Sequence, residues 1–157
     1  MYICFMSIEK EIKQGSFRSE QMKAMINFLY TANGVQLQQT QFFKKFDLSA
    51  QQYNILRILK GQLPNAATVN LLIERMLDKS SNASRLVEKL RLKGMVDRVQ
   101  NKEDRRAVNI KITNKGLALI DEIAEAHDEI QLLNVLSDKE AKSLNEILDK
   151  IRTAYKQ

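Results

Sequence analysis

Apolar side chains recur at intervals of three and four residues along most of this chain, which is the spacing of an α-helix with one buried face. A short helical turn is expected over residues 7–13, and a long helix is expected to begin near Ser19. The apolar positions of the long helix are Met22, Met25, Ile26, Leu29, Ala32 and Val35. This stripe fits a core helix or a helix that faces a partner equally well.

Helix-start signals then mark two further helices. Ser49 followed by Gln52 forms a capping box, and Gly61 begins the segment that ends this helix. The apolar side of the helix carries Tyr53, Ile55, Leu56, Ile58 and Leu59. Thr68 is expected to cap the next helix, whose predicted buried residues are Leu71, Leu72 and Leu77.

The next helix is predicted over residues 80–93, after a turn at residues 78–80. Its predicted buried face consists of Ala83, Leu86, Val87 and Leu90. Gly94 stands where a glycine commonly terminates a helix.

The apolar period changes to two after Gly94. Residues 95–99 are short, β-prone and alternating. Val108, Ile110 and Ile112 also alternate with polar residues. Two strands joined by the polar segment 101–106, directly after a helix-turn-helix, form a wing.

Two helices are expected to follow the wing. The first begins near Thr113, and Ser137 with Glu140 forms a capping box for the second. The apolar stripes comprise Leu117, Ile120, Ile123, Ala124, His127 and Ile130 in the first and Leu144, Ile147, Leu148 and Ile151 in the second. The predicted fold class is mainly α with a small β-hairpin wing: one unit over 1–157, with a winged helix-turn-helix over 48–113 and dimerisation helices over 7–47 and 114–157.

Charge points to a polyanionic partner. The net charge is +6, and residues 68–111 carry 11 Lys and Arg against 6 Asp and Glu, a net +5. Residues 113–157 carry 6 against 9, a net −3. A basic region is typical of a nucleic-acid surface, although charge by itself fits a solubilising surface as well.

The inventory of reactive residues argues against several classes. One Cys, Cys4, and one His, His127, provide no disulfide and no metal-ligand spacing, so we expect no metal and no cofactor. We find no Ser/His/Asp set and no Gly-rich phosphate loop, and therefore expect no enzyme. Without a signal peptide or an apolar run of bilayer length, a cytoplasmic protein is expected. Oxidation sensing by Cys4 is less favoured than no role, and a core or interface position is favoured for His127.

The polar face of helix 80–93 carries the candidate DNA contacts, which are Ser80, Ser81, Asn82, Ser84, Arg85 and Lys89. Arg85 suits a bidentate guanine contact, and Asn82 suits adenine. Ser80 and Ser81 suit phosphates. An ordinary solvated helix face is the alternative for this group.

The wing tip adds four candidates, Lys102, Asp104, Arg105 and Arg106. Alternate residues of an extended segment point the same way, so Asp104 can pair with Arg106 and preset it for a narrow minor groove. A solvated charge cluster is the alternative.

Three segments together resemble the MarR family of winged-helix regulators: DKSSNASRLVEKL with the following KGMVDR, the wing NKEDRRAV, and the junction IKITNKG. The similarity covers residues 48–116 well. It implies a homodimer on pseudo-palindromic double-stranded DNA, with no membrane partner, and places the family's Asp-x-Arg wing motif on Asp104 and Arg106.

The resemblance also implies a repressor that a small aromatic or phenolic effector releases from DNA. The pocket would be lined by Met25, Phe28, Tyr53 and Leu56. The apolar stripes at 22–35 and 144–151 agree with a two-fold dimer, because one protomer has too little chain to cover them. The main alternative function is a winged-helix protein-interaction module without specific DNA binding.

Overall fold

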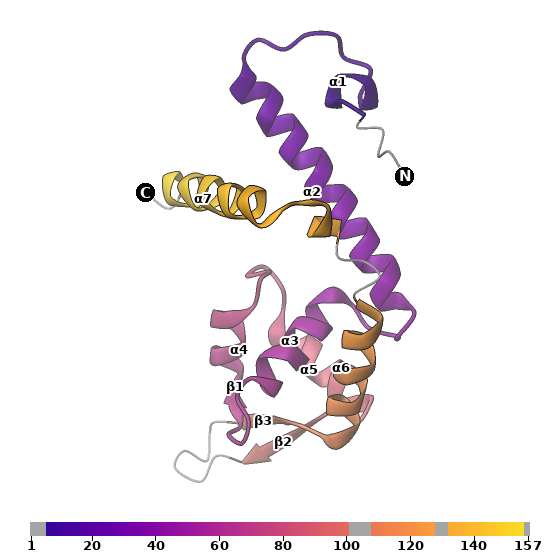
Figure 1. Cartoon of the computed structure of the whole chain (residues 1–157). Coiled ribbons are helices and arrows are strands. Elements are labelled where there is room, and N and C mark those ends of the chain that lie inside the picture. Colours follow the sequence, from indigo (N-terminus) through magenta and orange to yellow (C-terminus); the bar gives the residue numbers. More distant parts are fainter. Residues whose placement is uncertain (1–5, 101–107, 128–131, 156–157) are drawn as a thin grey trace. The chain divides into compact units, whose positions relative to one another are not determined.

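The computed structural model describes residues 6–100, 108–127 and 132–155, and the chain divides into two compact units, Met1–Asp47 and Leu48–Gln157. Figure 1 shows a mainly helical chain with one small antiparallel sheet. The predicted fold class is confirmed. Among the described residues, no helix is both long enough and apolar enough to cross a membrane.

The first unit consists of α1, Ile8–Glu11, and α2, Glu20–Lys44. Ser19 caps α2, because its side chain accepts the Met22 N–H. Two polar contacts join the helices: Glu9 to Lys23 at 2.5 Å, and the Tyr30 hydroxyl, which donates to Glu11 at 2.8 Å. Most of the large apolar side chains of α2 are exposed within the protomer, namely Met22, Met25, Phe28, Leu29, Tyr30 and Leu37.

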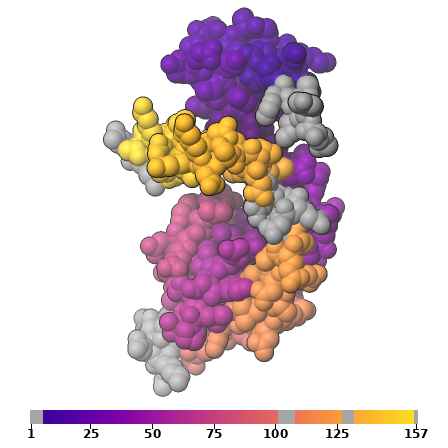
Figure 2. Space-filling model, in the orientation of Figure 1, coloured from indigo at the N-terminus to yellow at the C-terminus, as the bar shows by residue number. Residues whose placement is uncertain are grey.

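The second unit contains the predicted winged helix-turn-helix. Its elements are α3 (Ala50–Lys60), β1 (Ala67–Thr68), α4 (Val69–Arg75), α5 (Ala83–Leu92), β2 (Val96–Gln100), β3 (Val108–Ile112) and α6 (Asn114–His127). Helix α3 is central and contacts α4, α5, α6 and β3. Its capping box is present as predicted. The fully buried side chains include Ile55, Leu56, Leu59, Leu72, Val87, Leu90, Ile110, Ile120 and Ile123. Figure 2 shows the outer surface that these elements form.

The sheet has the order β1-β3-β2 with antiparallel pairing throughout. Ala67 pairs with Ile110, and Val96 pairs with Ile112. The β2–β3 hairpin was predicted, whereas β1 was not, because two residues carry no period. In β2 only Val96 is buried, so the alternation expected for this strand is absent.

The residues predicted to be buried beside Leu72 need one correction. Leu77 is 89% exposed and Met76 is buried in its place. Helix α4 ends at Arg75 and Met76 is extended, with φ −62° and ψ 140°. Helical spacing therefore does not extend to Leu77.

The C-terminal segment consists of a 3₁₀ turn, η2, at Leu132–Val135, and α7, Asp138–Ala154. Ser137 and Glu140 form the predicted capping box. Helix α7 has no buried residue in the protomer, and its Ile147 and Ile151 are exposed.

Candidate nucleic-acid interface

Helix α5 begins three residues later than expected. The sequence suggested a start at Ser80, but the N-cap is Asn82, whose Oδ1 accepts the Arg85 N–H at 3.0 Å. Ser80 lies in the turn before the helix, where its N–H and hydroxyl donate to Asp78. A bidentate pair between Asn82 and adenine also uses Oδ1. The adenine must therefore share this oxygen with the Arg85 N–H or displace that N–H from it.

The two faces of α5 differ as a reading helix requires. Ala83, Val87 and Leu90 are buried, and Leu86 is half-buried. The opposite face exposes Ser84, Arg85 and Lys89. Neither basic side chain forms an ion pair with the part of the chain that the structure describes, so both are available to an external ligand.

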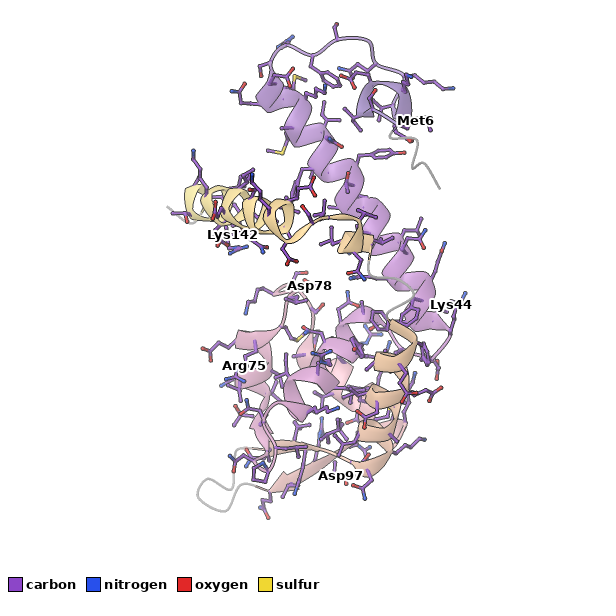
Figure 3. All side chains as sticks on the ribbon, in the orientation of Figure 1. Met6, Lys44, Arg75, Asp78, Asp97 and Lys142 are labelled. Atoms are coloured by element: carbon purple, nitrogen blue, oxygen red, sulfur yellow. The ribbon has the colours of Figure 1, made fainter. Side chains whose placement is uncertain are left out.

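Asp78 organises the turn between α4 and α5, where Figure 3 labels it. Its Oδ1 accepts the Ser80 N–H at 3.0 Å and the Ser80 hydroxyl at 2.6 Å. Its Oδ2 accepts the Ser81 hydroxyl at 2.6 Å and Gln51 Nε2 at 3.4 Å. These hydrogen bonds, those from the serine hydroxyls first, hold the pKa of Asp78 well below its usual range.

Two further contacts fix the same turn. The Leu77 N–H donates to Asn54 Oδ1 at 3.0 Å, and Lys79 Nζ donates to the Ile73 carbonyl at 3.0 Å and to the Glu74 carbonyl. Lys79 thereby satisfies carbonyls at the end of α4. Sequence reasoning missed Asp78, although an Asp two residues before a Ser is the signal of an Asx-turn.

The end of α5 is joined to the sheet and to α6. Gly94 has φ +71°, the left-handed conformation expected after a helix. The Gly94 carbonyl accepts the Thr113 hydroxyl at 2.8 Å, and the Lys93 carbonyl accepts Lys115 Nζ at 2.8 Å. These bonds fix the sheet and α6 relative to the C-terminal end of α5.

Glu88 links α5 to the first strand of the wing. It pairs with Arg91 at 2.8 Å and with Arg98 of β2 at 3.2 Å. The hydrogen bond from Arg91, with the charges of both arginines, lowers the pKa of Glu88. The base of the wing is therefore positioned from α5.

Comparison with known proteins identifies the family. The model of the MarR family matches residues 46–107. The transcriptional regulator PecS of Dickeya dadantii (strain 3937) is 30% identical over 112 residues, which cover 69% of this chain and 68% of PecS. The chain belongs to the MarR family.

Solved structures agree on the fold. The Staphylococcus aureus MepR–DNA complex has a TM-score of 0.73 at 21% identity, covering 88% of this chain and 99% of MepR. The organohalide-sensing regulator RdhR, solved with 2,4-dichlorophenol bound, has a TM-score of 0.75 at 18% identity, covering 98% of this chain and 89% of RdhR. This MarR-family chain is a DNA-binding transcription regulator and not an enzyme.

The structure does not describe every predicted site residue of this MarR-family chain. Lys102, Asp104, Arg105 and Arg106 lie outside the described residues, as does Cys4. Of the proposed pocket, Tyr53 and Leu56 are buried on α3 of the second unit, while Met25 and Phe28 are exposed on α2 of the first. Within the described ranges, no group of three or more His, Cys, Asp or Glu side chains is placed to hold a metal.

Proposed function

We propose that the protein is a homodimeric repressor that reads a pseudo-palindromic operator through α5 of each protomer. One observation carries the reading role: α5 is anchored by Val87 and Leu90, both fully buried, while Arg85 and Lys89 on its other face are exposed and unpaired among the described residues. Arg85 takes a guanine in the major groove, where a guanidinium matches O6 and N7. Ser84 and Lys89 contact the flanking backbone.

The wing supplies the second contact of each half-site. Arg106, preset by Asp104, enters the adjacent minor groove, while Lys102 and Arg105 neutralise phosphates. The ion pair between Arg98 of β2 and Glu88 of α5 supports this arrangement, because it fixes the wing's first strand to the reading helix.

The dimer buries the apolar faces that one protomer leaves open. Phe28, Leu29 and Leu37 of α2 are each about half exposed or more, and α7 exposes Ile147 and Ile151. Large apolar side chains left exposed on a helix mark a protein interface rather than free surface. In a two-fold dimer each protomer buries the same face against its partner. The two-fold axis also sets the half-sites about 10 base pairs apart.

An aromatic or phenolic effector releases the operator in this proposal. Met25, Phe28, Tyr53 and Leu56 are the apolar and aromatic side chains that the family resemblance suggests for the lining of its pocket. RdhR, the structural neighbour solved with 2,4-dichlorophenol bound, lends support to this ligand class. Such a ligand acts only if it binds the conformation that releases DNA more tightly than the conformation that holds it.

Selection of bound duplexes from a random library tests the reading role. We expect a two-fold symmetric motif whose binding, followed by fluorescence anisotropy, weakens steeply with salt because neutralised phosphates release counterions. A chain that enriches no motif and binds duplex without a steep salt slope is a protein-docking module instead. Halogenated phenols added to the bound complex then test the effector, and release without a change in protein folding is the expected result.

Light scattering of the full chain tests the dimer. Leu29→Glu places a charge on the apolar face of α2, and we expect it to shift the chain toward monomer and to weaken operator binding. Gln38→Glu makes the same charge on an exposed polar position on the opposite side of the same helix and serves as the matched control. A Leu29→Glu protein that stays dimeric contradicts the assignment of this face.

A further inference from the structure

The turn before the reading helix contains two serine hydroxyls that share one carboxylate. Ser80 Oγ lies 2.6 Å from Asp78 Oδ1, and Ser81 Oγ lies 2.6 Å from Asp78 Oδ2. A hydroxyl-to-carboxylate bond of this length is charge-assisted and among the strong ones. The low pKa of Asp78 has the same cause, so the carboxylate is ionised at neutral pH and acts only as an acceptor.

This arrangement determines what the two serines offer to DNA. A hydroxyl has one hydrogen to donate and two lone pairs that accept. Both serine hydrogens are donated to Asp78, so only the lone pairs remain. Phosphate oxygens are acceptors and cannot pair with a lone pair. In the major groove the groups that donate are the amino groups of adenine and cytosine.

We propose that Asp78 is a positioning residue that makes Ser80 an obligate hydrogen-bond acceptor, so that Ser80 reads a base amino group instead of holding a phosphate. Ser80 is exposed, whereas Ser81 is half-buried and serves the turn itself. This inference rests on the proposed reading role of α5. It replaces the phosphate role that the sequence suggested for Ser80.

The position of the carboxylate supports a role in specificity. A negative charge beside a DNA-reading helix repels phosphates and lowers affinity for any duplex. Gln51 of α3 also donates to the carboxylate at 3.4 Å, while Asn54 of α3 accepts the Leu77 N–H at 3.0 Å. The orientation of the Ser80 hydroxyl is thereby fixed from the domain core.

A double-mutant cycle on the selected operator tests the proposal. Ser80→Ala, Asp78→Ala and the double variant are titrated against operators changed one base pair at a time, and against an unrelated duplex. Asp97→Ala is the matched control, because the Asp97 side chain is exposed on β2 and forms no hydrogen bond or ion pair with the described residues. This control also replaces an aspartate with alanine, but it leaves the turn at Asp78 unchanged.

We expect Ser80→Ala to lose about two- to tenfold discrimination at one adenine or cytosine position of each half-site, the worth of one neutral hydrogen bond. Asp78→Ala loses preference at the same position, does not weaken binding to the unrelated duplex, and adds little in the double variant. Asp97→Ala keeps the preference. A merely structural role of Asp78 produces additive losses instead, because two independent defects add.

Three results overturn the proposal. Additive losses, or a loss that Ser80→Ala spreads evenly over all duplexes, assign Ser80 to a phosphate or to the fold. Should Asp78→Ala not fold, the base-by-base profile of Ser80→Ala decides alone. A wild-type chain that prefers no duplex refutes the reading role itself, which separates that failure from the failure of the Asp78 assignment.

Discussion

Of the five glycines, Gly116 is the one where an added methyl group would meet the closest neighbours. It lies in the first turn of α6, and a Cβ built on it stands 2.4 Å from the Met95 carbonyl oxygen and 2.9 Å from Ile112 Cγ1. Non-bonded carbon atoms pack best at about 3.5–4.0 Å. The Met95 carbonyl is not free to move away, because it accepts the Thr113 N–H at 3.1 Å. Gly116→Ala must therefore displace backbone.

Two opposing contributions set the expected change in the free energy of unfolding of Gly116→Ala. Alanine is favoured over glycine within a helix by ~0.8–1.0 kcal/mol, which works in favour of the variant. Overpacking a close contact costs ~1–3 kcal/mol, and the upper part of that range applies because the obstacle is backbone. We expect a net loss of about 1–2 kcal/mol in the free energy of unfolding, which lowers Tm by about 2–8 °C for a chain of this size.

Urea and thermal unfolding of the full chain, followed by circular dichroism at several protein concentrations, measure the loss. Gly34→Ala is the control, because it lies within α2 and its added methyl has no neighbour within 4 Å outside its own helix backbone. The control is expected to gain about 0.5–1 kcal/mol from helix propensity. The reasoning is refuted if Gly116→Ala is as stable as the control variant.

Three more predictions concern DNA and pH. Arg85→Ala should cost ~1–3 kcal/mol of operator binding and relax one base position per half-site in anisotropy titrations; an even loss over all sequences makes Arg85 a phosphate contact instead. Arg106→Ala should reduce the salt slope of operator binding by about one unit, and an unchanged slope and affinity contradict the wing assignment. Because bonds from Ser80 and Ser81 lower the pKa of Asp78, its ionised form stabilises the fold above the ordinary value of 3.8, and this contribution is lost as the pH falls below 3.8 through the lowered pKa. The stability gap between wild type and Asp78→Ala in urea should therefore shrink between about pH 7 and about pH 3, and an equal gap at both values counts against the Asp78 hydrogen bonds.

Much of the fold was readable from short stretches of sequence. The capping boxes at Ser49 and Ser137 are present because both partners lie within three residues, so no distant contact decides them. Gly94 adopts the left-handed conformation for a similarly local reason. The period-two pattern of Val108, Ile110 and Ile112 likewise predicted strand β3, because one face of a strand is set by alternate residues.

The start of the reading helix was a question that local sequence left open. Ser and Asn both cap helices well, and the sequence analysis began this helix at Ser80. In the structure Asn82 is the N-cap, while Ser80 lies in a turn where its N–H and hydroxyl donate to Asp78. Gln51 of α3, 27 positions away along the chain, also donates to Asp78 and so ties this turn to α3.

Two further differences between the sequence analysis and the structure concern strand β1 and the end of α4. Strand β1 has two residues and exists because β3 pairs with it, while Met76 is buried and Leu77 exposed because α4 ends at Arg75, two residues before Leu77. The sequence by itself determined most of the elements and their faces, since caps and periods act within one or two turns. Only the tertiary structure decided how the turn before α5 is tied to α3, because Gln51 and Asn54 lie far from that turn along the chain.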